Sequence, residues 1–424
     1  MRLDTDIIIV GSGVGGATVA KELVKKGKKV LVVEKGRPFP LARIGTVRYA
    51  YNFYDKNGTW SKTKEGIFYY RAIMLGGTSI ISCGNGVRAL EKEFKNLGID
   101  LTKEFLETEQ ELSIRPVPEN FIGRGTKKIV MAADKLGFNM VPMPKFIKFE
   151  KCICCGNCAL GCRRDAKWTS LKYLKEAQDN GISLLTGINV TNILVYNSKA
   201  SGIEGYSEIG EKIRISAKAV VLAAGAIGTA VILQASGIRA GEKLFLDLFN
   251  VTVGITKEVG SANELTMAAV SRQDGFILSP FMDNWLALAS VLPKWRILNV
   301  MRRQHMLGVM TKIEDDCVGR VYKDGFIEKT VTSKDLSRLK KGADVSREIL
   351  IQAGANPRSV IITKVRGAHP GGTAAIGEVV DKNLETKIKG LFICDASVLP
   401  FTPGLPPIVT IIALAKKFAT SFVY

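Results

Sequence analysis

The N-terminal segment carries the pattern that most constrains the fold of this chain. Residues 6–10 form a short apolar run rich in β-branched side chains, residues 15–26 repeat apolar positions at helical spacing, and residues 29–33 form a second apolar run that ends at Glu34. Between the first run and the helix lie the three glycines of a G-x-G-x-x-G motif: Gly11, Gly13 and Gly16. Strand, helix and strand joined by short connections predict a parallel βαβ unit of the Rossmann type.

Each part of this motif has its own task in binding a dinucleotide. The first glycine permits a tight turn, the second lets the backbone approach a pyrophosphate, and the third lets the helix pack closely on the strand. The N–H groups at the helix N-terminus then face the phosphates. Glu34 can accept hydrogen bonds from ribose hydroxyls, and its charge would repel the 2′-phosphate of NADP. NAD and FAD share this pattern, and an ordinary glycine turn is the structural alternative.

Four further motifs follow along the chain. They are a glycine cluster at 75–79, an apolar run that ends in an Ala-Gly signature at 220–229, and two segments at 369–374 and 391–397. In this order they resemble the motifs of the glucose–methanol–choline (GMC) flavoprotein family. The resemblance implies that FAD is the cofactor, that the protein is an FAD-dependent oxidoreductase and that its substrate is a small molecule.

The resemblance also implies which further residues meet FAD. The backbone of Val190 would contact the adenine, and Asp395 would lie near the pyrophosphate and the ribityl chain. Some relatives attach FAD covalently through a histidine in the flavin loop, but Ile81 takes that place here, so we expect non-covalent FAD. The glycines of this loop would let it pass close beside the isoalloxazine ring. The candidate cofactor-binding residues outside the first motif are Gly76, Gly77, Thr78, Val190, Ala224, Gly225 and Asp395.

The chain has 424 residues, which is too many for one ordinary core, so we expect two domains. We predict an α/β protein with a Rossmann-type FAD-binding domain and an α+β substrate domain built on an antiparallel sheet. Because the cofactor motifs lie at both ends and in the middle of the chain, the FAD-binding domain should be discontinuous. The expected boundaries are 1–90, 186–250 and 366–424 for the FAD-binding domain, 91–185 for a connecting region that contains the cysteine segment 152–162, and 251–365 for the substrate domain.

Five of the eight cysteines fall between residues 152 and 162. Four of them have the C-x2-C-x2-C-x3-C spacing of bacterial ferredoxins, which predicts an iron–sulfur cluster: Cys152, Cys155, Cys158 and Cys162. The chain has no second run of this kind, so the last cysteine closes a 4Fe-4S cluster or leaves a 3Fe-4S form, and Cys154 is spare. A zinc site and inert or disulfide-bonded thiols are the alternatives.

The chain contains only two histidines, His305 and His369. His369 matches the active-site histidine of the GMC family, which takes the hydroxyl proton while hydride passes to the flavin; the alternative is a structural histidine in a glycine-rich turn. The family places a second polar residue, Asn or His, where this chain has Pro406. Proline cannot relay a proton. The site would therefore use another residue such as Arg366 or Lys364, accept a more hydrophobic substrate, or run as a reductase.

The formal net charge is +20, yet the basic residues are scattered, so we interpret them as a solvated basic face and expect no nucleic-acid partner. Basic residues beside the cysteine segment could dock an acidic ferredoxin. The apolar stretch 276–292 predicts a contact with an anionic membrane surface, with a buried substrate-domain segment as the alternative. No apolar run reaches the roughly 18–20 residues of a spanning helix, and no signal peptide is evident, so we expect a cytoplasmic protein, with the membrane contact at the surface.

These patterns lead to one main functional prediction and two alternatives. The main prediction is an oxidoreductase that moves hydride between a substrate carbinol or carbonyl and FAD and relays electrons through an iron–sulfur cluster to or from a carrier such as ferredoxin. The first alternative is a ferredoxin-fed reductase of a hydrophobic or isoprenoid-like double bond. The second is an electron-transfer subunit with no substrate chemistry of its own.

Overall fold

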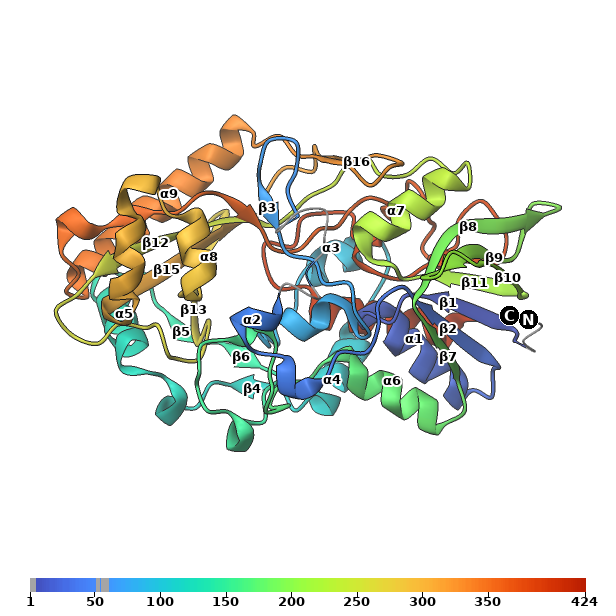
Figure 1. Ribbon diagram of the computed structural model, residues 1–424, viewed down its shortest axis with the longest axis horizontal. Coiled ribbons are helices and arrows are strands. Elements are labelled where there is room, and N and C mark those ends of the chain that lie inside the picture. The colour runs from blue at the N-terminus through green and yellow to red at the C-terminus, as the bar shows by residue number, and fades with distance from the viewer. Residues whose placement is uncertain (1–4, 51–53, 55–60) are drawn as a thin grey trace.

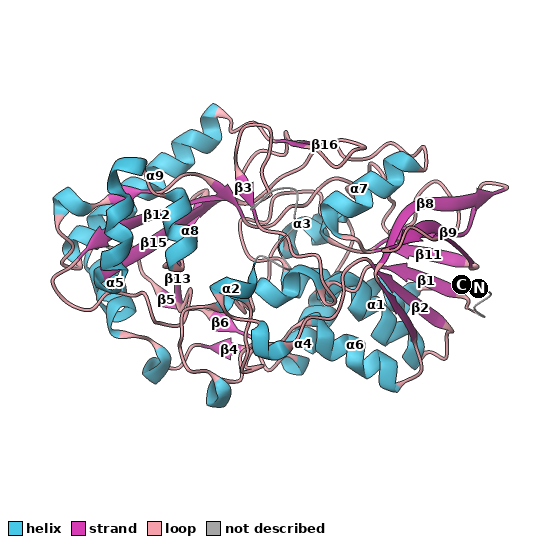
Figure 2. Cartoon of the chain, in the orientation of Figure 1, coloured by secondary structure: helices cyan, strands magenta, loops and turns pink. Residues whose placement is uncertain are grey.

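The computed structural model describes residues 5–50, 54 and 61–424. The molecule is elongated and has a β-sheet at each end (Figures 1 and 2). The sheet near both chain termini is parallel, the sheet at the opposite end is largely antiparallel, and helices and loops fill the space between them.

The parallel sheet has five strands that come from three separated parts of the chain. In every strand but the one at 183–186, all residues are buried, which explains why these strands have continuous apolar sequences. The strands, in spatial order, are β20 (Leu391–Ile393), β11 (Ala219–Leu222), β1 (Ile7–Val10), β2 (Val30–Glu34) and β7 (Ser183–Thr186).

Helices and a small antiparallel sheet cover this parallel sheet. Helix α1 packs against α6 and α10, and α10 packs against α4. A three-stranded antiparallel sheet and α7 lie near β11. The helices are α1 (Val14–Lys25), α4 (Thr102–Glu111), α6 (Ser170–Asp179), α7 (Gly225–Ala235) and α10 (Ile408–Ser421). The strands of the small sheet are β8 (Ile188–Tyr196), β9 (Lys199–Ser207) and β10 (Lys212–Ser216).

The second large sheet has eight strands, and all its pairs are antiparallel except β19 with β3. Its strands are β3 (Phe68–Tyr69), β19 (Arg366–Gly367), β12 (Leu248–Ile255), β15 (Met306–Ile313), β14 (Phe276–Pro280), β13 (Ala269–Gln273), β5 (Val141–Pro142) and β18 (Ile361–Ile362). Helices α5 (Arg124–Lys135) and α9 (Ser333–Gln352) pack against it, and α8 (Trp285–Val291) and the 3-10 segment η6 (Lys294–His305) follow β14.

Local sequence explains why α9 begins and packs where it does. The side chain of Thr332 accepts a hydrogen bond from the backbone N–H of Asp335, and the carboxylate of Asp335 accepts one from the backbone N–H of Thr332, which forms a capping box. Gly342 lets the helix approach the sheet, because a Cβ at this position would lie 2.1 Å from the Thr311 side chain of β15. The remaining short elements are α2 (Val47–Ala50), α3 (Glu91–Asn96), β4 (Arg115–Pro116), β6 (Pro144–Lys145), β16 (Arg320–Val321) and β17 (Ile327–Glu328).

The predicted α/β fold with a Rossmann-type unit and a second, mainly antiparallel domain is confirmed. The predicted lipid contact over 276–292 is wrong for its first part, because residues 276–280 form β14 and are buried inside the second sheet. The physical reason is that a short apolar run has the same pattern in a core strand as in a surface anchor. Among the described residues, no helix is both long enough and apolar enough to cross a bilayer.

Candidate active site

The glycine-rich turn between β1 and α1 has the geometry that its sequence predicts. Gly11 has a φ of +106°, a left-handed conformation that favours glycine. A Cβ on Gly16 would lie 2.0 Å from the carbonyl oxygen of Gly11, so only glycine lets the helix start this close to the strand. Gly13 is different, because a Cβ there would meet no protein atom within 4 Å. The space in front of Gly13 is therefore open to a ligand.

A network of buried serines joins this turn to the second glycine cluster, in which Gly77 begins the 3-10 turn η2 (Gly77–Ile81). The Ser12 hydroxyl accepts from the Gly76 backbone N–H at 2.9 Å, and the Ser170 hydroxyl donates to the carbonyl oxygens of Ser12 and Gly76. A Cβ on Gly77 would lie 3.3 Å from the Cα of Gly13. The two glycine loops thus lie side by side, as a cofactor that touches both would require.

Glu34 ends β2 and is buried against the first turn. Its carboxylate accepts from the backbone N–H and hydroxyl of Ser12, both at 2.7 Å, and from the Gly36 N–H. Burial raises the pKa of Glu34, while these hydrogen bonds and the charge of Arg71 oppose the rise. Arg71 is a residue that sequence reasoning missed. Its guanidinium also reaches the start of α7, where it would lie 3.3 Å from a Cβ on Gly228.

Asp395, which follows β20 of the parallel sheet, fixes the start of α7. Its Oδ2 accepts from the Gly225 N–H at 2.8 Å and from the Thr229 hydroxyl at 2.6 Å. Gly225 has a φ of +75°, and a Cβ there would meet nothing within 4 Å, so the space in front of it is also open. Ala224 is the residue that caps α7, and Val190 lies in β8 just before an irregularity in its pairing with β9.

His369 lies two residues after β19 of the second sheet, and it forms a network with two charged residues. Its Nδ1 is 2.7 Å from Oδ2 of Asp247, which in turn accepts from Nζ of Lys312 at 2.8 Å. An ionised carboxylate only accepts hydrogen bonds, so Nδ1 must carry the proton that it shares with Asp247. Nζ of Lys312 also lies 3.3 Å from Nδ1 of His369. Nε2 of His369 is left without its proton and can act as a base.

The charges around His369 favour its neutral form. Burial and the positive charge of Lys312 lower the pKa of His369 below the usual value of 6.5, against the opposing effect of Asp247. Burial alone would raise the pKa of Asp247, but Lys312 and His369 outweigh it and hold this carboxyl below its usual range. The site therefore presents a neutral imidazole at pH 7, oriented by a carboxylate on its far nitrogen.

A second buried ion pair holds Asp247 in place. Asp247 has a φ of +51°, which is unusual for a residue other than glycine. The backbone N–H groups of Leu246 and Leu248, on either side of it, both donate to the carboxylate of Asp315, which pairs with Lys329 at 2.7 Å. Strain of this kind persists only where the surroundings impose it, and it is concentrated at functional sites.

Arg366, predicted as a replacement for the missing polar residue at Pro406, has another task. Its guanidinium is buried and makes two hydrogen bonds to Asp283, at 2.7 and 2.9 Å, and one to the hydroxyl of Tyr70. The physical reason is that a buried arginine needs a paired carboxylate, which Asp283 supplies. Lys364 is exposed. The charged residue that lies beside His369 is Lys312, and sequence reasoning missed it.

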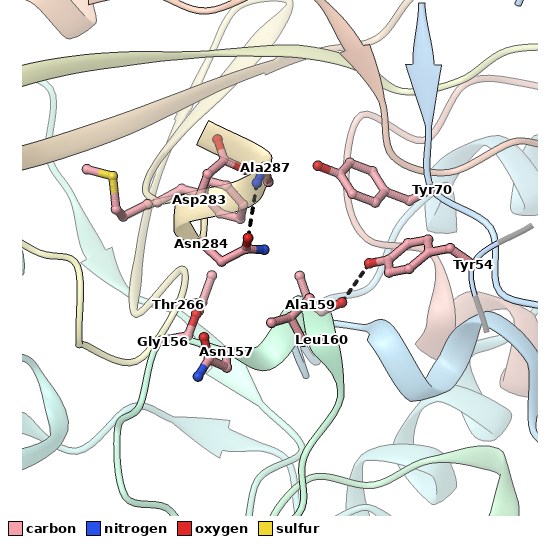
Figure 3. Close-up of a pocket in the computed structure, with 12 residues that line it drawn as sticks. Tyr54, Tyr70, Gly156, Asn157, Ala159, Leu160, Thr266, Asp283, Asn284 and Ala287 are labelled. Atoms are coloured by element: carbon pink, nitrogen blue, oxygen red, sulfur yellow. Dashed lines mark hydrogen bonds between the residues drawn. The ribbon is translucent and has the colours of Figure 1, made fainter. Parts of the chain in front are cut away.

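A pocket adjoins this region (Figure 3). It encloses about 380 Å³ including space open to solvent, and Tyr54 and Tyr70 face the start of α8 across it. The Tyr54 hydroxyl donates to the carbonyl oxygen of Ala159, which ties the pocket wall to the cysteine segment. His369 does not line this pocket. The other lining residues are Gly156, Asn157, Leu160, Thr266, Phe281, Met282, Asp283, Asn284 and Ala287.

The cysteine segment forms a tight loop around the 3-10 turn η5 (Cys158–Leu160). All its cysteines are free thiols, and the Cys162 sulfur accepts from the backbone N–H of Ala166 at 3.4 Å. Cys154, expected to be spare, shares a hydrogen bond with Cys152 that raises the pKa of Cys152, a rise to which burial adds. Within the described residues, no three His, Cys, Asp or Glu side chains converge as the ligands of a metal ion would. The predicted metal site is therefore not formed by this arrangement of the loop.

Two buried lysines lie beside these thiols. Lys167 Nζ donates to the carbonyl oxygens of Ser82 and Cys158, and so joins the end of the flavin loop to the cysteine loop. Lys145 Nζ donates to Cys83 O at 2.9 Å and to Asn85 Oδ1 at 2.6 Å. Burial lowers the pKa of Lys145 to about 8, although the neighbouring thiols oppose this effect.

Comparison with known proteins identifies the family. The N-terminal and C-terminal profiles of the GMC oxidoreductase family match residues 5–261 and 327–415. The chain belongs to the GMC oxidoreductase family. The protein is thus an FAD-dependent oxidoreductase, as predicted.

Individual GMC relatives are similar along most of the chain. An uncharacterised protein of Methanocaldococcus jannaschii is 32% identical over 419 residues, which span 97% of this chain and 98% of that one. A long-chain-alcohol oxidase of Arabidopsis thaliana is 26% identical over 519 residues, covering 99% of this chain and 68% of the relative. The crystal structure of pyridoxine 4-oxidase from Mesorbium loti has the same fold, with a TM-score of 0.77, 17% identity and 99% coverage of both chains.

The residues around the glycine loops fit the FAD of a GMC enzyme. Gly13 and Gly225 each face open space that a side chain would fill, as a site for a pyrophosphate requires. The N-cap of α1 is Gly13, which offers no side chain to cap the helix, and no acidic residue lies in the first turn. The N-terminus of α1 can therefore attract phosphate oxygens.

Proposed function

We propose that this GMC oxidoreductase moves a hydride between a substrate carbinol and FAD, with His369 as the group that accepts the hydroxyl proton. The observation that carries the proposal is the bond of His369 Nδ1 to Asp247, which leaves Nε2 as the basic nitrogen. When bound, FAD supplies the acceptor for the two electrons of the C–H bond. The proton of the carbinol O–H goes to Nε2, and a carbonyl compound is released; the reverse sequence reduces a carbonyl.

Asp247 and Lys312 act through His369 and are positioning residues. Asp247 fixes the tautomer and the ring orientation, and it stabilises the imidazolium that forms when His369 takes a proton. Lys312 keeps the resting imidazole neutral at pH 7. Together they orient and tune a single base, which is how the chain would manage without the second polar residue that Pro406 replaces.

We propose the following assignment of cofactor-binding residues and domains. Gly11, Gly13 and Gly16 bind the pyrophosphate, and Glu34 meets the ribose. Gly76, Gly77 and Thr78 pass beside the flavin ring, Val190 meets the adenine, and Ala224, Gly225 and Asp395 complete the site near the ribityl chain. The FAD-binding domain comprises 1–90, 186–250 and 366–424, the connecting region 91–185 and the substrate domain 251–365.

The substrate is proposed to be a hydrophobic carbinol or carbonyl compound. One of the relatives is a long-chain-alcohol oxidase. The pocket beside the Arg366–Asp283 pair combines aromatic and apolar side chains, including Tyr54, Tyr70 and Phe281, with four polar ones: Asn157, Thr266, Asp283 and Asn284. A pocket of this kind holds the apolar part of a ligand and leaves polar recognition to a few groups.

We further propose that Cys152, Cys155, Cys158 and Cys162 hold an iron–sulfur cluster after rearrangement of their side chains. The spacing of the four cysteines supports the cluster. The buried ammonium groups of Lys145 and Lys167 also support it, because they lie near the thiols that would carry negative charge as cluster ligands. A cluster here would carry single electrons. Four exposed basic residues lie beside the loop and suit an acidic carrier such as ferredoxin: Lys148, Lys151, Arg163 and Arg164. A ferredoxin-fed reductase is therefore the second candidate function.

The cluster proposal is tested by metal and sulfide analysis of protein prepared without oxygen. Iron and acid-labile sulfide should be present in the wild type and in Cys154→Ser, and absent from Cys158→Ser. Zinc without sulfide, or neither metal, would contradict the proposal.

The hydride proposal is tested with His369→Ala and a panel of aliphatic alcohols of increasing chain length. The variant should retain FAD, and alcohol-driven flavin reduction should fall by about 10²–10⁴, the usual contribution of a positioned proton acceptor. His305→Ala is the matched control, because this histidine is exposed and its Nδ1 is hydrogen-bonded to the carbonyl oxygen of Glu258. Equal reduction rates in wild type and His369→Ala would refute the assignment.

A further inference from the structure

The 3-10 segment η6 exposes a row of large apolar side chains at the end of the molecule that holds the second sheet. A 3-10 helix has three residues per turn, so side chains three apart lie on one face. Trp295, Leu298 and Met301 follow this spacing and are 74%, 76% and 85% exposed. Trp285 and Ile297 are also exposed, and we call these five residues the tryptophan patch.

The opposite face of η6 is anchored to the protein. Val300 packs against the hydrophobic core cluster that includes Val251 and Met310. Arg303 donates to the carbonyl oxygens of Asp283, at 2.6 Å, and Ala262, at 2.8 Å. The row of apolar side chains is therefore held outward by a fixed inner face.

The charge of the segment is of one sign. From residue 284 to residue 313 the sequence contains no Asp or Glu, and it contains Lys294, Arg296, Arg302 and Arg303. Arg296 lies over the ring of Trp295, with 4.4 Å between its guanidinium carbon and the ring centroid, and it donates to the carbonyl oxygen of Arg358, another exposed basic residue. The formal net charge of the whole chain is also positive, at +20.

We propose that the tryptophan patch docks on the surface of an anionic lipid bilayer. Tryptophan prefers the boundary between water and lipid, and a peripheral anchor combines apolar side chains with lysine or arginine that attract anionic headgroups. An acidic protein would match the charge but would not require three protruding apolar side chains in a row. The patch lies beyond the buried strand β14, so it differs from the lipid contact predicted from sequence and shares only Trp285 with it.

The position of the patch has a consequence for the site. Helix α8 carries Trp285 in the patch, and Ala287 of the same helix lines the pocket of Figure 3. Docking would bring this pocket close to the membrane surface, where a hydrophobic substrate would partition. The docking itself is independent of the reaction, since none of the patch residues belongs to the site around His369.

Vesicle flotation of the FAD-loaded protein tests the proposal. The wild type should float with vesicles that contain phosphatidylglycerol and remain behind with vesicles of phosphatidylcholine alone. A variant with Trp295→Ser, Leu298→Ser and Met301→Ser should lose flotation. A matched control that replaces three exposed apolar residues elsewhere should float like the wild type: Met131→Ser, Tyr196→Ser and Ile209→Ser.

A charge variant separates lipid binding from other uses of the patch. Lys294→Glu with Arg302→Glu should reduce partitioning at least about tenfold, because each basic residue near an anionic surface contributes about 1 kcal/mol. Wild-type protein that does not float, or a serine variant that floats normally, would overturn the proposal. So would sedimentation that shows a dimer lost in the serine variant with no lipid binding, since the patch would then be a subunit interface.

Discussion

Replacing Lys312 by methionine should raise the pKa of His369 above its wild-type value. In the wild type, burial and Lys312 hold the pKa of His369 below 6.5. Methionine has a similar length but no charge, so the carboxylate of Asp247, 2.7 Å from Nδ1, would remain as the main charged neighbour. A carboxylate stabilises the imidazolium, and the shift must therefore be upward.

The distance between the two side chains shows how strongly Lys312 opposes protonation of His369. Lys312 Nζ lies 3.3 Å from His369 Nδ1, and two unit charges at this distance repel by about 5 kcal/mol at an effective dielectric constant of about 20. One pKa unit corresponds to about 1.4 kcal/mol. The His369 side chain is 28% exposed and shares its charge between two nitrogens, so water screens much of the repulsion. Removal of this repulsion should raise the pKa of His369, while burial continues to oppose protonation.

NMR of the histidine ring measures this directly, because the chain has only two histidines. Protein labelled with ¹³C-histidine gives two ring signals, and His305→Gln assigns them. The His369 signal should titrate below pH 6.5 in the wild type and in Lys312→Arg, and at a higher pH than in these two proteins in Lys312→Met. The acid limb of flavin reduction should move to higher pH with it, since a protonated imidazole cannot accept a proton.

Lys329→Met is the matched control, because it removes another buried ammonium from an ion pair with a neighbouring carboxylate, Asp315. It should destabilise the fold but leave the His369 titration near its wild-type position. A Lys312→Met protein in which the pKa of His369 is unchanged or lower would refute the electrostatic reasoning.

Two further predictions concern the cofactor site and the buried ion pairs. Gly13→Val should abolish FAD binding, measured as flavin retained after gel filtration. The unfolding free energy of the FAD-free protein should change by no more than about 0.5 kcal/mol, because a Cβ at this position meets no protein atom within 4 Å. Retained FAD would contradict the placement of the phosphates. Asp283→Asn should lower the unfolding free energy, measured with denaturant, by about 3–5 kcal/mol, because Arg366 stays buried without its paired charge. Glu208→Gln, in an exposed ion pair, should change the unfolding free energy little. Equal losses in the two variants would contradict the argument.

The glycine turn and the elements around it could be predicted from sequence because their causes are local. The strand at 29–33 and the helix at 15–26 both occur within a residue of their predicted bounds. Apolar periodicity decides such elements, and the spacing of Gly11, Gly13 and Gly16 decides the turn.

The partners of His369 could not be predicted because nothing local specifies them. Asp247 lies 122 positions and Lys312 57 positions away in sequence. The only signal was indirect: each is a single charged residue in an apolar strand region, Lys312 within β15 and Asp247 directly before β12. A charge in such a position must be paired when buried, but the sequence does not say with what.

Flavin reduction by a deuterated alcohol tests the central claim most directly. The FAD-loaded enzyme, mixed without oxygen with a long-chain primary alcohol, should show bleaching of the oxidised flavin at a rate that falls several-fold when the carbinol carbon carries deuterium, because its C–H bond breaks in that step. A flavin that no alcohol reduces, and that is reduced only by ferredoxin, would contradict the account and identify the protein as a reductase or an electron-transfer subunit.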